Sequence, residues 1–137
     1  MRIIDEVNEV NIFQMNSEDI IEALNSIKSD KEAEIRMIKG KIDKYEKKRR
    51  SEDAMYQSLS PIKKLFTSRA PSHHQAVEYM VYVRERFNSI EKIKQNIAVL
   101  DKLISLVHSE PSKEEIFLSG LLIEEIKAWK EAEVRQK

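Results

Sequence analysis

The chain has 137 residues, with 24 basic and 24 acidic side chains and therefore no formal net charge. It holds no cysteine and only two glycines, which excludes a disulfide scaffold, a thiolate metal site and a glycine-rich phosphate-binding loop. The zero net charge argues against a protein that binds nucleic acid through its overall charge. The content of Glu, Lys, Ile and Leu favours long helices.

Residues 1–15 form a short leading segment whose apolar positions suit one helical face. Ile3, Val7 and Val10 are spaced by four and three, with Phe13 close by. A run of this length is not a stable helix alone, so we expect it to pack on the main body, with a strand as the alternative. The segment is acidic where an export signal is basic, and this predicts a cytoplasmic protein. No apolar run of the sequence is long enough to predict a membrane span.

The range 17–58 predicts the first long helix. Asn16 supplies a capping side chain, and acidic residues follow it near the positive end of the helix dipole. Spacings of three and four then continue as a heptad seam, within which we expect Gly40 to mark a bend or a close contact. Charged residues, Lys28 and Lys31 among them, interrupt the seam near both ends. These interruptions are compatible with a homo-oligomer in which more than one partner helix completes the seam.

The segment 59–72 contains Pro61 and Pro71, so we expect a turn there. The range 73–109 then predicts a second long helix. Its apolar stripe departs from a strict heptad repeat, which favours ordinary bundle packing over a long supercoil. The stripe comprises Met80, Val83, Phe87, Ile90, Ile93, Ile97, Leu100, Ile104 and Val107.

The range 112–134 predicts a third helix. Ser112 and Glu115 match a capping box immediately before Ile116 and Phe117. Trp129 is the expected anchor of this helix. Because the connections are short, consecutive helices are expected to pack side by side. The predicted fold class is therefore all-α: one helical domain with an elongated three-helix arrangement, in which a long antiparallel, coiled-coil-like hairpin accompanies a short N-terminal segment.

Charge is unevenly distributed along the chain. Residues 1–38 hold 4 basic and 9 acidic side chains, whereas residues 39–74 hold 10 basic and 4 acidic ones. In a hairpin this arrangement gathers basic charge at one end, next to apolar residues of the turn. A solvated helix face is the alternative explanation. The candidate partner-binding residues are Lys47, Lys48, Arg49, Arg50, Lys63, Lys64, Phe66 and Arg69.

No catalytic, cofactor-binding or metal-binding residues are predicted. His74 and Glu78 have metal-ligand spacing, but the sequence offers no second cluster to complete a site. The expected function is therefore a non-enzymatic helical protein–protein interaction module, acting as an adaptor, regulator or assembly subunit. The alternative is a nucleic-acid-associated protein that uses the basic segment 39–74, although Tyr45 and Tyr56 alone do not make a stacking platform for bases.

Overall fold

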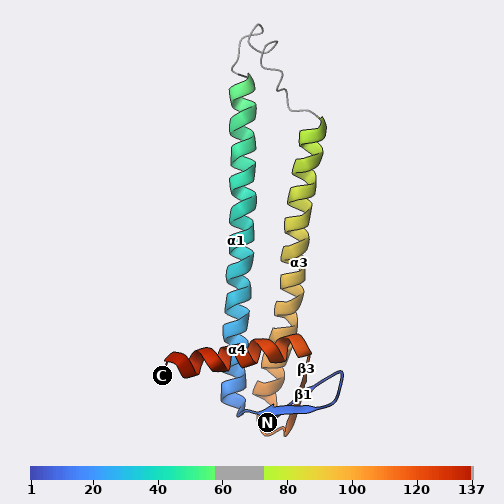
Figure 1. The fold of residues 1–137 in the computed structure, drawn as a ribbon, viewed down its shortest axis with the longest axis vertical. Coiled ribbons are helices and arrows are strands. Elements are labelled where there is room, and N and C mark those ends of the chain that lie inside the picture. The colour runs from blue at the N-terminus through green and yellow to red at the C-terminus, as the bar shows by residue number, and fades with distance from the viewer. Residues whose placement is uncertain (58–72, 137) are drawn as a thin grey trace. The chain divides into compact units, whose positions relative to one another are not determined.

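The computed structural model describes residues 1–57 and 73–136 of the chain (Figure 1). These residues are mostly helical, and they also contain a small three-stranded sheet. The all-α prediction is therefore right for the bulk of the chain and wrong for its two flanking segments. The described elements are β1 (Arg2–Asp5), β2 (Asn11–Gln14), α1 (Ser17–Gln57), α3 (His73–Ser109), β3 (Glu115–Leu118) and α4 (Gly120–Gln136).

The two long helices occupy nearly the ranges that their apolar spacing indicates. Helix α1 begins after Asn16, whose Oδ1 accepts a hydrogen bond of 2.7 Å from the backbone N–H of Asp19. This is the expected cap, and it satisfies one of the unpaired N–H groups at the helix start. The predicted turn 59–72 lies outside the described residues.

Strands β1 and β2 replace the helix expected within residues 1–15. They pair antiparallel, with Ile3 opposite Phe13 and a bulge where Ile4 meets Asn11. The helical prediction is wrong because the local apolar spacing also suits two short strands, which tertiary pairing with β3 stabilises. Ile3 is fully buried in the resulting core.

The loop between β1 and β2 has a specific backbone conformation. Asp5 Oδ1 accepts hydrogen bonds from the N–H groups of Val7 at 2.9 Å and Asn8 at 3.3 Å. Glu9 then adopts a left-handed conformation, with φ of 55°. Its N–H donates to the Asp5 carbonyl at 2.8 Å, which closes the loop.

Strand β3 occupies the start of the predicted third helix. It runs parallel to β1, with Ile3 opposite Ile116, and it makes β1 the middle strand in the order β2-β1-β3. The proposed capping box at Ser112 is therefore wrong, because Glu115 belongs to a strand. Helix α4 begins at Gly120 instead, and Ser119 Oγ accepts a hydrogen bond of 3.2 Å from the N–H of Leu122.

The chain divides into two compact units, and the expectation of one helical domain stays a prediction. Unit 1 comprises residues 1–33 and 94–137, and unit 2 comprises residues 34–93. Unit 1 contains the sheet, α4 and the core cluster, against which the half-buried Trp129 packs as expected. Figure 1 shows α4 lying across the parts of α1 and α3 that belong to this unit. The core residues are Ile3, Met15, Ile20, Ala23, Leu24, Ile27, Leu100, Val107, Ile116, Leu118, Leu122, Ile123 and Ile126.

The polar positions of the α1 seam in unit 1 are occupied by ion pairs within the chain. Lys28 Nζ lies 2.6 Å from Asp101 Oδ1, and Lys31 Nζ lies 3.4 Å from Glu125 Oε2. The hydrogen bond to Asp101 raises the pKa of Lys28 above its ordinary value, against a smaller opposing effect of desolvation. Neither lysine therefore requires a helix from another chain.

Candidate protein interface

The four side chains of the basic run 47–50 have different environments on the helix. Arg49 is half-buried, with its guanidinium carbon 4.1 Å from the centre of the Tyr79 ring. Arg50 lies within 3.6 Å of the Glu46 carboxylate. Lys47 and Lys48 are exposed. The two arginines thus contribute to contacts within unit 2, and the two lysines remain at the surface.

Three tyrosines join α1 and α3 within unit 2. Tyr45 stacks on Tyr79 and Tyr82, with ring centres 5.5 and 4.4 Å apart. The guanidinium of Arg86 covers Tyr82 at 4.5 Å, much as Arg49 covers Tyr79. Because residues later in α1 contact residues earlier in α3, the helices run antiparallel within this unit. Cations and neighbouring rings pack against these tyrosines, which favours a packing role for them over a platform for bases.

The Tyr79 hydroxyl has a carboxylate partner. It donates a hydrogen bond of 2.9 Å to Glu46 Oε1. This hydrogen bond, followed by partial burial, raises the pKa of Tyr79 above the ordinary value of 10.0. The rings of Tyr79 and Tyr82 are both half-buried and lie between the two helices.

A basic surface runs along the side of α1 that faces away from α3. Lys41, Lys44 and Lys48 follow each other at spacings of three and four, and Lys47 lies beside them. We call these four exposed residues the lysine face. None of the acidic side chains that the structure describes forms an ion pair with them. The lysine face therefore offers four positive charges without partners among the described acidic groups.

Helix α3 carries large apolar side chains that are exposed. In its described part within unit 2 these are Val77, Met80, Val81 and Phe87, and their exposed fractions range from 44 to 59%. We call these four residues the α3 stripe. The sequence grouped Met80 and Phe87 with Ile90 in one stripe, and Ile90 is buried whereas the other two are exposed. The buried part of the predicted stripe therefore begins at Ile90.

The α3 stripe could have been recognised in the sequence by a second spacing pattern. Val77, Met80 and Val81 stand at helical intervals of three and four, and Phe87 follows Met80 at an interval of seven. A helix with apolar residues beyond its buried face has more apolar surface than one neighbouring helix covers. Among the described residues of unit 2, the buried apolar ones are Ile42, Ile90 and Ile93.

The other predicted contact residues cannot be placed. Lys63, Lys64, Phe66 and Arg69 lie outside the described residues, so their grouping into an apolar and basic tip stays a prediction. Within the described part of the chain, no group of three or more histidine or acidic side chains could hold a metal ion. Nor does any helix in this part carry an apolar stretch long enough to span a bilayer.

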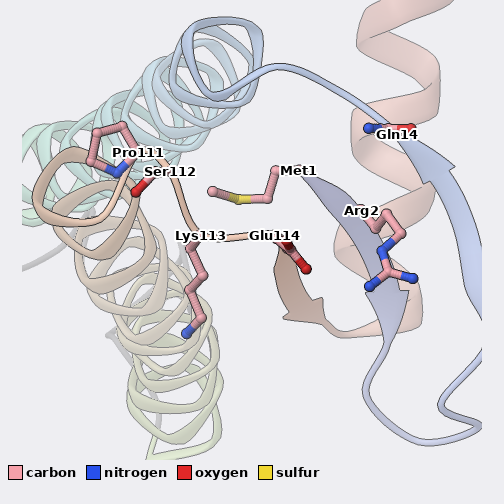
Figure 2. Close-up of a pocket in the computed structure, with 7 residues that line it drawn as sticks. All are labelled: Met1, Arg2, Gln14, Pro111, Ser112, Lys113 and Glu114. Atoms are coloured by element: carbon pink, nitrogen blue, oxygen red, sulfur yellow. The ribbon is translucent and has the colours of Figure 1, made fainter.

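Unit 1 contains an open pocket of about 340 Å³ between the sheet and the segment that links α3 to β3 (Figure 2). Two of its cationic side chains are already paired: Arg2 with Glu115, and Lys113 with Glu110 at 3.9 Å. These pairs reduce the charge that the pocket can offer to an anion. The pocket is lined by Met1, Arg2, Gln14, Pro111, Ser112, Lys113 and Glu114.

The candidate binding surfaces of the described chain are thus the exposed lysine face and the exposed α3 stripe, both in unit 2. Comparisons of the chain with protein-family models, with curated proteins and with solved structures found no match.

Proposed function

We propose that the chain is a non-enzymatic helical protein–protein interaction module that docks an acidic protein partner through the lysine face. The observation that carries this proposal is the arrangement of Lys41, Lys44, Lys47 and Lys48, which are exposed and have no described acidic partner. Arranged charges of one sign steer an oppositely charged partner and fix its orientation. The role is that of an adaptor, a regulator or an assembly subunit.

The framework for this role is the predicted antiparallel, coiled-coil-like hairpin. Support for it comes from the aromatic contacts that hold α1 against α3, above all those of Tyr45 with Tyr79 and Tyr82. They fix the side of α1 that bears Ile42 and Arg49, and so turn the lysine face outward. The basic residues predicted in segment 59–72 lie outside the described residues, and their part in binding stays a prediction. A cytoplasmic location also stays a prediction.

Charge reversal on the lysine face tests the proposal. The probe is an immobilised glutamate-rich peptide, and binding is measured by biolayer interferometry at about 50 mM salt, where surface charge is weakly screened. We expect wild type to bind and K44E/K48E to lose affinity by about tenfold or more. The matched control K102E/R135E makes the same change of charge at exposed residues of unit 1 and should bind like wild type.

A duplex DNA of comparable charge distinguishes the alternative. Tighter binding to DNA than to the peptide, with affinity that falls steeply as salt rises, would favour a nucleic-acid-associated protein over the proposal. Equal loss of peptide binding in K44E/K48E and in the control would also contradict it, because the lysine face would then have no special role.

A further inference from the structure

In unit 1, helix α1 already binds carboxylates of neighbouring helices through its lysines. Lys28 Nζ lies 2.6 Å from Asp101 Oδ1 of α3, and Lys31 Nζ lies 3.4 Å from Glu125 Oε2 of α4. The two lysines stand three residues apart on α1, and each meets an acid that another helix presents. Lysines at helical spacing thus join α1 to other helices within this unit.

The lysine face repeats this spacing in unit 2, where none of the described acidic side chains pairs with it. Lys41, Lys44 and Lys48 stand at intervals of three and four, so they form a row parallel to the helix axis. Seven residues at about 1.5 Å each make this row about 10 Å long. Carboxylates on one face of a second helix recur at the same intervals, so each lysine can face one. Side chains on one face of an extended peptide recur only about every 6.6 Å, which matches the row less well.

Met37 adds an apolar contact at one end of this row. It stands one turn before Lys41 on the same side of α1, and it is 58% exposed. The surface between them is open, because a β-carbon added at Gly40 would have no atom within 4 Å. Methionine packs readily against apolar groups of different shapes. A partner that carries acids alone leaves Met37 uncovered, whereas an amphipathic partner covers both Met37 and the lysines.

We infer that the acidic partner of the lysine face is an amphipathic helix that lies along α1. The inference rests on the proposed function and names the form of its partner. Carboxylates at helical spacing pair with Lys41, Lys44 and Lys48, and an apolar residue one turn beyond them packs on Met37. Charge pairs between two helices select the partner and fix its orientation.

Three synthetic peptides of equal charge test the form of the partner. The first places three glutamates and one leucine on one face of an alanine-rich helix. The second has the same residues in an order that distributes them around the helix, and the third is the first with two central prolines, which prevent helix formation. By biolayer interferometry at about 50 mM salt, we expect wild type to bind the first peptide about fivefold or more tightly than either of the others.

Substitution of Met37 isolates the apolar contact. Met37→Ser should weaken binding of the first peptide by about threefold or more and leave binding of the glutamate-rich peptide unchanged. Met80→Ser is the matched control, because Met80 is 59% exposed on α3, and it should bind the first peptide like wild type. K44E/K48E should lose affinity for both peptides.

The outcomes separate this inference from the proposed function. Equal binding of the three peptides overturns the inference, and so do equal effects of Met37→Ser and Met80→Ser on the first peptide. Tightest binding of the proline peptide overturns it as well, in favour of an extended partner. In each of these cases the proposed function stands if K44E/K48E loses the glutamate-rich peptide. A wild type that binds none of the acidic peptides contradicts both.

Discussion

The hydroxyl of Tyr79 on α3 donates a hydrogen bond to the carboxylate of Glu46 on α1, and this contact makes the helix pairing of unit 2 sensitive to pH. Because the folded chain raises the pKa of Tyr79 above 10.0, it holds the phenol proton more tightly than the unfolded chain does. The stabilisation from this contact is therefore fully present below pH 10.0 and is lost as the pH rises through the raised pKa.

We predict that replacing Glu46 with glutamine lowers the pKa of Tyr79 towards 10.0, because the carboxylate is the main cause of the shift. Ultraviolet titration of tyrosinate, compared with that of Tyr79→Phe, measures this change. Glu52→Gln removes an exposed carboxylate from the same helix and should leave the titration of Tyr79 as it is. A titration of Tyr79 that is identical in Glu46→Gln and wild type would contradict the assignment of the cause.

The helix caps yield a second prediction. Asn16→Ala and Ser119→Ala should each lower the free energy of unfolding by about 0.5–2 kcal/mol, because each side chain accepts a hydrogen bond from the first turn of its helix. Ser112→Ala should change it by less than about 0.5 kcal/mol, since Ser112 is exposed and begins no helix. Urea unfolding of the full chain measures all three. If Ser112→Ala lowered the free energy of unfolding more than Ser119→Ala does, the result would favour the capping box over the observed strand.

Glu9 is the subject of a third prediction. Its φ of 55° is unfavourable for a residue with a β-carbon and natural for glycine. Glu9→Gly should therefore raise the free energy of unfolding by about 0.5–1 kcal/mol. Glu9→Ala keeps the β-carbon and removes the same charge, so it should bring no such gain. Equal stabilisation by both variants in urea unfolding would attribute the effect to charge and not to backbone conformation.

Gly40 yields a fourth prediction. A β-carbon added at this helical position would have no atom within 4 Å, so the glycine serves neither a close contact nor a left-handed conformation. Gly40→Ala should therefore stabilise the protein by about 0.5–1 kcal/mol in thermal or urea unfolding. Gly120→Ala, at the first residue of α4, should stabilise the protein by less. Destabilisation by Gly40→Ala would show that another molecule or copy approaches α1 closely at this point.

The sequence was informative where structure depends on neighbours along the chain. The spacing of apolar residues located α1 and α3, and Asn16 marked the start of α1. The sequence did not predict the sheet, because the parallel partner of β1 comes from a segment more than a hundred residues later, with Arg2 opposite Glu115. Short apolar runs such as that around Ile116 fit a strand or a helix equally well, and only the distant partner decides between them.

The candidate interface shows the same limit. Composition located the basic run 47–50, but the role of each residue depends on α3. Arg49 lies over Tyr79, and its neighbour Lys48 does not, because a helix turns successive side chains in different directions. The sequence alone does not show which basic residues remain at the surface, because this depends on the Tyr79 ring under Arg49.

The position of β1 in the sheet has a consequence for the order in which the protein folds. A ribosome makes β1 and β2 before β3, so these two strands can meet first, but the other edge of β1 has no partner until β3 has been synthesised. All of unit 2 is made during this interval. If its helices pair first, they shorten the chain that must be closed to bring β3 to β1. Until then one edge of β1, which carries Ile3 and Ile4, has no neighbouring strand and could pair with another chain.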